Sequence, residues 1–384
     1  MKYVQRHIED AIRGAMERSP VTALVGPRQA GKSTLARYIL DHPGDAVYLD
    51  LERPSDLQKL NDAEWFLTSQ KDKLICIDEI QRKPELFPLI RSLTDEWKQP
   101  GKFLVLGSAS RDLLRQSSES LAGRISYQKL TPFLWKEISG NTSIETYLFR
   151  GGFPRSLLAN NDAQSLAWRE DFITTFLERD LRQWQGFNPV TMRRLWQMLA
   201  HVNGQTVNYS LLGNSLGVSN VSIKNYIDLL EATFMLEVVP PYHSNTKKRM
   251  VKSPRIYISD QGITTALLHL ESFEALFGHP VIGAVWEQTV LTNLKGCFPS
   301  GEYYYYRSSG GAEVDFVMKH KGRTFAIECK SSQSPKPSKG FYSATEDINP
   351  DHSYIVAPVK EGWPANRTTD VMNLDEIIHT IGEV

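Results

Sequence analysis

The sequence predicts an α/β protein with a parallel-sheet domain, a mostly helical block and a second α/β domain. Over residues 21–133, short apolar runs alternate with helical patterns, which is typical of a parallel sheet. Such runs largely vanish from residue 134 to about residue 241, where helical periodicity dominates. Strand-like runs return from residue 255 onward. We therefore expect domains at residues 1–133, 134–244 and 245–384.

Composition narrows the class of protein. The 384 residues are 41% hydrophobic and 23% charged, as in globular proteins, and no apolar stretch is long enough to span a bilayer. Because the 44 basic and 44 acidic residues cancel, nucleic-acid binding would need a local basic patch. Cys76, Cys297 and Cys329 form no CxxC pair. We therefore expect a soluble, cytoplasmic protein without a membrane partner.

The first expected strand, VTALVG, leads into GPRQAGKST and then into the helical pattern TLARYIL. This loop satisfies G-x-x-x-x-G-K-[ST] in the strand–loop–helix context that the motif requires. Its glycines let backbone N–H groups surround phosphates, Lys32 supplies a cation, and the Ser33 hydroxyl can ligate Mg²⁺. We expect ATP to contact the whole loop: Gly26, Pro27, Arg28, Gln29, Ala30, Gly31, Lys32, Ser33 and Thr34.

A second apolar strand, LICIDEI, ends in two carboxylates. Asp78 is expected to complete the Mg²⁺ shell and Glu79 to polarise the attacking water, which favours hydrolysis over simple nucleotide binding. Ser108, at the end of the strand FLVLGS, is a candidate for contacting the water or the γ-phosphate. Arg124, in SLAGR, is a candidate arginine finger. For both residues a turn or solvated-loop role is the alternative.

The segments GPRQAGKST, YLDLE, LICIDEIQ, LGSAS, LAGR and ERDL closely resemble a family of prokaryotic AAA-type ATPases fused to a C-terminal domain of unknown function. The resemblance covers nearly the whole chain. It implies an AAA-like ATPase core, use of Arg124 across a subunit interface in a homo-oligomer, and a C-terminal domain with a restriction-endonuclease-like core.

The middle block contains the pattern of a helix-turn-helix. In NYSLLGNSLGVSNVSIKNYIDLLEATFMLEVV, a turn near Gly217 separates two helical patterns, and FMLEVVPPY is a candidate wing. DNA would meet the start of the second helix, at Ser219, Asn220, Ser222 and Lys224. A purely structural helical lid is the alternative, since the second helix carries little positive charge. Nearby basic residues favour phosphate contact: Lys247, Lys248, Arg249, Lys252 and Arg255.

In the last block, AEVDFV and TFAIECK read as two strands of a hairpin joined by the turn KHKGR. Asp315 and Glu328 then converge on one Mg²⁺ or Mn²⁺ ion, with Lys330 beside them, as in the D…E-x-K core of PD-(D/E)XK nucleases. Glu287, on a preceding helix, can add a carboxylate, and Glu313 faces the same side as Asp315. The alternative is a set of acids that only form ion pairs.

These patterns together predict Mg²⁺-dependent ATP hydrolysis coupled to DNA binding and metal-dependent DNA cleavage. The catalytic candidates are Glu79, Arg124, Asp315, Glu328 and Lys330, and the metal-ligand candidates are Ser33, Asp78, Glu287, Asp315 and Glu328. The competing interpretation is a nucleotide-gated regulator that binds DNA or a protein partner and cleaves nothing.

Overall fold

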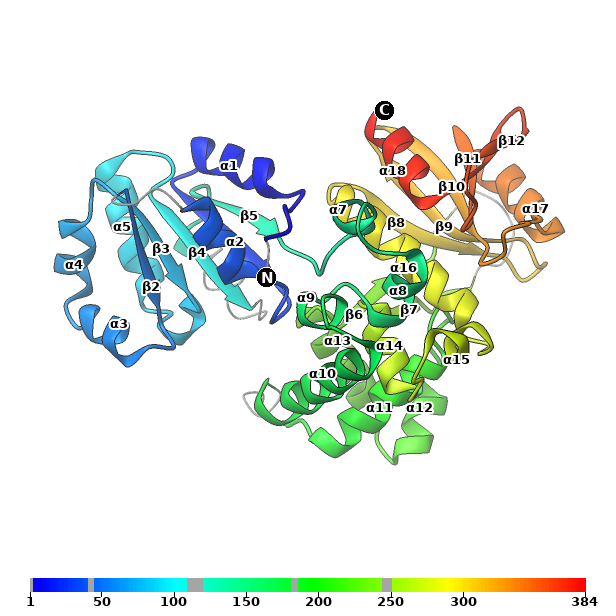
Figure 1. Ribbon diagram of the computed structural model, residues 1–384, viewed down its shortest axis with the longest axis horizontal. Coiled ribbons are helices and arrows are strands. Elements are labelled where there is room, and N and C mark those ends of the chain that lie inside the picture. Colours follow the sequence, from blue (N-terminus) through cyan, green and yellow to red (C-terminus); the bar gives the residue numbers. More distant parts are fainter. Residues whose placement is uncertain (1–2, 41–44, 109–119, 181–185, 244–250) are drawn as a thin grey trace. The chain divides into compact units, whose positions relative to one another are not determined.

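The computed structural model describes residues 3–40, 45–108, 120–180, 186–243 and 251–384 (Figure 1). The chain divides into two compact units, one of residues 1–133 with 232–234 and the other of residues 134–231 with 235–384. Within the described ranges, no helix is both long and apolar enough to cross a membrane. The predicted parallel sheet in the first unit and a second, mixed sheet in the other are both present.

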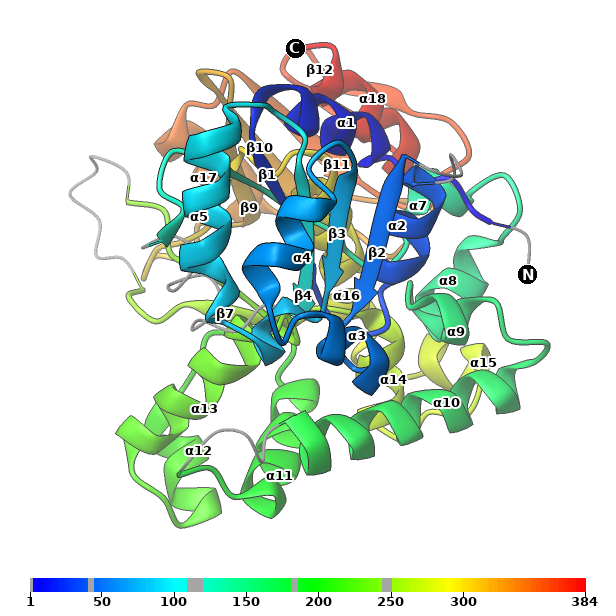
Figure 2. The ribbon, with the colours of Figure 1, turned by 90° about the vertical axis from the view of Figure 1, so that its left-hand side faces the viewer.

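The first unit is built on a five-stranded parallel sheet in the order β2-β3-β4-β1-β5. In Figure 2 this sheet faces the viewer, with β3 between β2 and β4. Its strands are β1 (Val21–Gly26), β2 (Ala46–Asp50), β3 (Leu74–Asp78), β4 (Phe103–Ser108) and β5 (Ile125–Lys129). The helical elements are α1 (Glu9–Arg18), α2 (Lys32–Ile39), α3 (Pro54–Lys59), α4 (Ala63–Ser69), η1 (Ile80–Arg82) and α5 (Leu86–Trp97).

Both faces of this sheet are covered, which explains why its strands read as continuous apolar runs. On one face, Ile75 and Ile77 of β3 pack with Ile90 and Trp97 of α5. On the other face, Cys76 packs in a core shared with α1 and α2. The two layers of helices are visible on either side of the sheet in Figure 1. Consecutive residues of β3 therefore point to opposite cores.

Helices dominate the beginning of the second unit. They are α7 (Trp135–Ile138), α8 (Ile144–Arg150), α9 (Pro154–Leu157), α10 (Asp162–Thr175), η2 (Phe176–Asp180), α11 (Pro189–His201), α12 (Tyr209–Leu216) and α13 (Asn220–Ala232). Helices α10 to α13 share a core that includes the fully buried Trp196. As the sequence suggested, α12 and α13 are separated by a short turn, where Gly217 adopts a left-handed conformation with φ 68°.

The rest of the second unit combines helices with two sheets. Strands β6 (Leu236–Val239) and β7 (Arg255–Ile258) pair antiparallel. The larger sheet has the order β12-β13-β11-β10-β9-β8 and mixes parallel with antiparallel pairs. Its strands are β8 (Glu302–Arg307), β9 (Glu313–His320), β10 (Arg323–Cys329), β11 (His352–Val356), β12 (Trp363–Asn366) and β13 (Thr369–Met372). The helices are α14 (Gln261–Leu267), α15 (Phe273–Phe277), α16 (Ile282–Cys297), α17 (Lys339–Ile348) and α18 (Leu374–Gly382).

Candidate functional site

The loop between β1 and α2 has a backbone that most residues could not adopt. Gly26 has φ 155°, and a Cβ atom there would lie 2.1 Å from the Leu130 carbonyl oxygen. Gly31, at φ 100°, precedes the first residue of α2, and Gln29 is also at positive φ. The buried Arg6 guanidinium fixes the loop further, because it donates to the Ala30 carbonyl at 3.0 Å. The glycines of the motif are thus required by the backbone.

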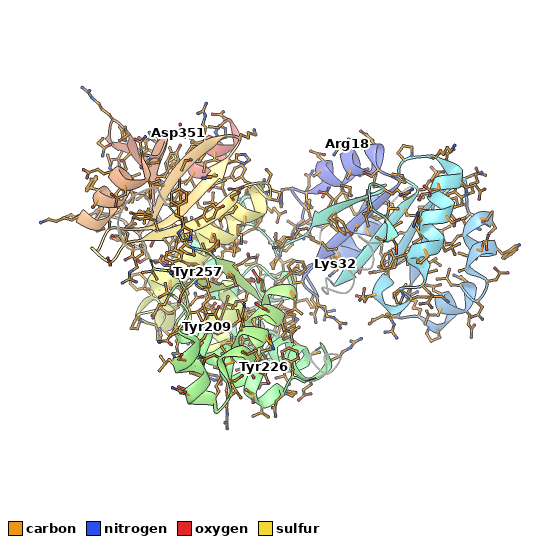
Figure 3. All side chains as sticks on the ribbon, turned by 180° about the vertical axis from the view of Figure 1, so that it is seen from behind. Arg18, Lys32, Tyr209, Tyr226, Tyr257 and Asp351 are labelled. Carbon is orange, nitrogen blue, oxygen red and sulfur yellow. The ribbon has the colours of Figure 1, made fainter. Side chains whose placement is uncertain are left out.

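Lys32 is the first residue of α2 and is buried (Figure 3). Its Nζ donates to the carbonyl oxygens of Gly26 at 3.0 Å and Pro27 at 2.9 Å, so the amine folds back over the loop. Burial lowers the pKa of Lys32 to about 8, although the charges of Glu79 and Asp78 act in the opposite direction. The amine therefore lies in the field of both carboxylates predicted for this site.

Asp78 ends β3 and is held at both carboxylate oxygens. Its Oδ1 accepts the Glu79 backbone N–H at 2.9 Å, and its Oδ2 accepts the Tyr48 hydroxyl. The Ser33 hydroxyl lies close enough to Tyr48 to act on the pKa of its hydroxyl, which it lowers against the effect of burial. The structure thus brings together Ser33 and Asp78, the two side chains predicted to ligate Mg²⁺. Their hydroxyl and carboxylate oxygens are the donors that Mg²⁺ prefers.

Glu79 follows directly in a left-handed conformation, with φ 56°. Such backbone is uncommon outside glycine and clusters at functional sites. Its carboxylate accepts a hydrogen bond from the Gln81 side-chain amide. Glu79 is therefore oriented by its own backbone and by a neighbour, beside the lysine of the loop.

Ser108 and Arg124 lie at opposite ends of the parallel strands, Ser108 at the carboxyl end and Arg124 at the amino end. Ser108 is in register with Gly26, so it ends its strand beside the phosphate loop; its side chain lies outside the described part of the structure. Arg124 precedes β5, whose first residue is in register with Val21 at the other edge. Its guanidinium binds Asp95 of α5 through Nε at 2.5 Å and Nη2 at 3.0 Å.

The predicted hairpin in the second unit is confirmed, because β9 and β10 pair antiparallel with Phe316 opposite Ile327. Asp315 is anchored in it by the Cys329 N–H, which donates to its Oδ2 at 2.8 Å. Glu328 is buried, and its carboxylate accepts from Lys330 Nζ at 2.6 Å. Burial, and then the charge of Asp315, raise the pKa of Glu328 to about 7, while Lys330 opposes that shift.

A basic side chain occupies the centre of this acidic group. Arg255 of β7, 4% exposed, donates from Nη1 to Asp315 Oδ1 at 3.3 Å and from Nη2 to Glu313. Its buried Nε finds no hydrogen-bond partner among the described residues. Glu287 approaches from α16 and accepts the Tyr257 hydroxyl at 3.0 Å; Tyr257 is labelled in Figure 3. Burial, and then Asp315, hold the pKa of Glu287 well above its usual value.

Among the residues that the structure describes, no three His, Cys, Asp or Glu side chains are grouped so that they could hold a metal ion. In this arrangement the acids of the second unit do not fit a metal ion. The reason is that the Arg255 guanidinium lies between Glu313 and Asp315. The expectation that Arg255 contacts DNA phosphates is wrong, since its side chain is buried. A charged residue opening the apolar strand RIYI was the sequence signal for this role.

The residues predicted to meet DNA lie at the start of α13. The Ser219 hydroxyl accepts the Ser222 N–H at 3.1 Å and so caps the helix. The Asn220 side-chain amide donates to the Ser210 hydroxyl at 3.2 Å. Lys224 is exposed on the first turns of the helix. The basic residues Lys247, Lys248 and Arg249 lie outside the described residues.

Family models match successive parts of the chain. Residues 18–139 match the model described as AAA domain, and residues 141–274 and 282–377 match two domains of unknown function (DUF8612 and DUF4143). The uncharacterized protein Rv2008c of Mycobacterium tuberculosis is 38% identical over 370 residues, which cover 96% of this chain and 83% of that protein. The chain belongs to the same family. The predicted AAA-type ATPase domain, joined to a C-terminal domain of unknown function, is confirmed at that level.

Two more distant proteins also align with this chain. The uncharacterized protein MJ1637 of Methanocaldococcus jannaschii is 24% identical over 415 residues, covering 92% of this chain and 82% of that protein. Among solved structures, the Walker-type ATPase PABY2304 of Pyrococcus abyssi aligns with a TM-score of 0.49 and 17% identity, over 69% of this chain and 96% of that one. At that TM-score, the ATPase assignment rests on the AAA-domain match and the phosphate-loop geometry.

Proposed function

We propose that the first unit hydrolyses ATP with Mg²⁺. The observation that carries the proposal is the close placement of Lys32, Ser33 and Asp78 at the carboxyl ends of the parallel strands, where the Tyr48 hydroxyl donates to Asp78. In open α/β sheets, ligands bind at this edge. Backbone N–H groups of a glycine-rich loop that opens a helix are suited to phosphate oxygens.

Each side chain then has a distinct role. Lys32 exchanges its two loop carbonyls for phosphate oxygens, which bind a cation more strongly. Ser33 and Asp78 hold the Mg²⁺, which screens the charge of the phosphates. Glu79 orients the attacking water and accepts its proton, while Ser108 contacts the water or the γ-phosphate. Gln81 keeps the Glu79 carboxylate in place until nucleotide enters.

The test separates binding from chemistry. Lys32→Ala should abolish ATP binding measured by calorimetry, whereas the exposed Lys71→Ala should leave it unchanged. Glu79→Gln should bind ATP normally but hydrolyse it about 10²–10⁴-fold more slowly, because only proton transfer is lost. Equal hydrolysis by wild type and Glu79→Gln would exclude Glu79 as the base.

A second proposed function is DNA handling by the other unit. The helix–turn–helix arrangement of α12 and α13 followed by the β6–β7 ribbon supports a winged-helix reading, with Lys224 exposed for phosphate contact. The antiparallel placement of Asp315 and Glu328, with Lys330 beside them, supports a restriction-endonuclease-like core. Against cleavage stands Arg255, which fills the acidic group. We therefore favour ATP-dependent DNA binding, with cleavage excluded while Arg255 is in place.

The test measures binding and cleavage of plasmid DNA and of single-stranded DNA. Each is measured with and without ATP, in the presence of Mg²⁺ or Mn²⁺. Binding without cleavage supports the nucleotide-gated regulator. Metal-dependent cleavage lost in Asp315→Asn, with ATP turnover unchanged, supports the nuclease. If the chain binds neither plasmid nor single-stranded DNA, a protein partner becomes the favoured alternative.

A further inference from the structure

The Tyr48 hydroxyl occupies a central position in the nucleotide site that neither the loop motif nor the acidic strand end accounts for. Tyr48 lies on β2, in register with Cys76 of β3, so its side chain projects on the same sheet face as Asp78, two residues further along. This is the face covered by α2, which carries Ser33. The Tyr48 side chain thereby contacts the acidic strand through Asp78 and the phosphate-loop helix through Arg37.

The hydrogen bond to the strand end has a clear direction. The Tyr48 hydroxyl donates its proton to Asp78 Oδ2. Asp78 Oδ1 is fixed separately by the Glu79 N–H, which donates to it at 2.9 Å. Both oxygens of this proposed Mg²⁺ ligand are thus oriented by hydrogen bonds from the protein itself.

A further contact holds the ring in place. The Arg37 guanidinium of α2 lies over the Tyr48 ring, 4.9 Å from its centroid, and holds the ring under the helix.

We propose that Tyr48 is a positioning residue, whose hydroxyl holds the Asp78 carboxylate in the orientation in which it receives the Mg²⁺ of Mg-ATP. This role rests on the proposed ATPase function and adds to it a residue outside both motifs. Groups that orient metal ligands through hydrogen bonds commonly change metal affinity about 10–100-fold when removed. Because Tyr48 acts on Asp78, we expect its effect to be confined to the metal-dependent part of nucleotide binding.

The experiment compares Tyr48→Phe with wild type as full-length chains. Phenylalanine keeps the ring under Arg37 and removes only the hydroxyl. ATP affinity is measured by calorimetry in EDTA and then across a Mg²⁺ titration. We expect equal affinity in EDTA, and a Mg²⁺ midpoint that rises about tenfold in Tyr48→Phe. Tyr38→Phe, at an exposed position of α2, is the matched control and should behave as wild type in both conditions.

Each other outcome is decisive. An unchanged Mg²⁺ midpoint in Tyr48→Phe would overturn the positioning role while leaving the ATPase intact. A lower midpoint would mean that Tyr48 competes with the ion, which also overturns it. Weaker ATP binding in EDTA, or a lower melting temperature that accounts for the loss, would assign Tyr48 to structure. If wild type shows no Mg²⁺-dependent ATP binding, the proposed function falls and this role with it.

Discussion

Arg255 and Asp315 form a buried ion pair across two strands of the second unit, with Nη1 3.3 Å from Oδ1 and side-chain exposures of 5% and 12%. The same guanidinium pairs with Glu313, so one internal cation serves two carboxylates. Breaking such a pair from one side leaves a buried charge without compensation, which is costly. The Arg255 side chain therefore fills the position that an ion would need.

Arg255→Gln should make this acidic group responsive to metal. In EDTA we expect a loss of about 3–5 kcal/mol in the free energy of unfolding, because Asp315 and Glu313 lose their partner. Mn²⁺ should then restore stability as its concentration exceeds the dissociation constant. Thermal melts with and without Mn²⁺ provide the measurement, and wild type should respond little.

The matched control for this experiment is Arg307→Gln. Arg307 also pairs with Glu313, at 3.5 Å, but its side chain is 48% exposed. Surface pairs of this kind contribute about 0–1 kcal/mol, so neither stability nor metal response should change much. If Arg255→Gln lowers the stability and Mn²⁺ does not restore it, the acids serve only a structural role. The metal site, and with it the nuclease interpretation, would then be wrong.

ATP affinity should fall as the pH rises above about 8. Burial lowers the pKa of Lys32 to about 8, and only the charged amine attracts phosphate. Below that pH the amine already carries its proton; above it, binding must take one up, so affinity drops about tenfold per pH unit. Calorimetry of Mg-ATP binding at pH 9, in two buffers of different ionisation enthalpy, should reveal uptake of one proton, and at pH 7 none. No pH dependence would mean that Lys32 is charged throughout.

Arg124 should act on the nucleotide of a neighbouring subunit. It precedes β5 at the amino edge of the sheet, and five strand residues at about 3.3 Å each separate that edge from the phosphate loop. Arg124→Ala should bind ATP normally and hydrolyse it about 10³-fold more slowly. Mixing it with Lys32→Ala should restore turnover, because each supplies what the other lacks.

Asp95→Ala is the companion to that variant. It removes the carboxylate that binds the Arg124 guanidinium, so ATP turnover should be retained or rise. Failure of rescue at every mixing ratio, together with a monomeric mass in the presence of ATP, would remove the finger assignment.

Two substitutions at the start of α13 should separate DNA contact from helix capping. Lys224→Ala should weaken DNA binding and lower the slope of log affinity against log salt by about 1, as loss of one phosphate contact does. Ser219→Ala should instead cost about 1 kcal/mol of stability, since its hydroxyl caps the helix. Fluorescence anisotropy at several salt concentrations distinguishes them. An unchanged salt slope in Lys224→Ala would place DNA elsewhere or exclude it.

Local pattern was sufficient for much of the fold. The glycine spacing of the phosphate loop, the acids ending LICIDEI and the alternation of the last hairpin each depend on neighbours in sequence, and the structure has the expected elements there. The periodicity of NYSLLGNSLG and NVSIKNYIDLL likewise identified two helices. In each case a few consecutive residues contain the whole signal.

Contacts between distant residues were not predictable in the same way. Tyr48 meets Asp78 across thirty positions, and Arg255 meets Asp315 across sixty. Both contacts depend on which strands lie side by side: β2 lies beside β3, and β7 lies near β9. No short sequence segment predicts that order. The predicted carboxylates were present, but the cation that shares them came from outside the motif.

Arg6 links the phosphate loop to residues 131 and 132 through hydrogen bonds. Its Nη1 donates to the Ala30 carbonyl of the loop, and its Nη2 donates to Thr131 at 2.7 Å and Pro132 at 3.3 Å, just before the chain leaves this unit. The planar guanidinium of Arg6 thus donates hydrogen bonds to three backbone carbonyl oxygens. A displacement of the phosphate loop is therefore expected to move residues 131 and 132 with it, and replacing Arg6 by a side chain without the guanidinium would uncouple the two segments.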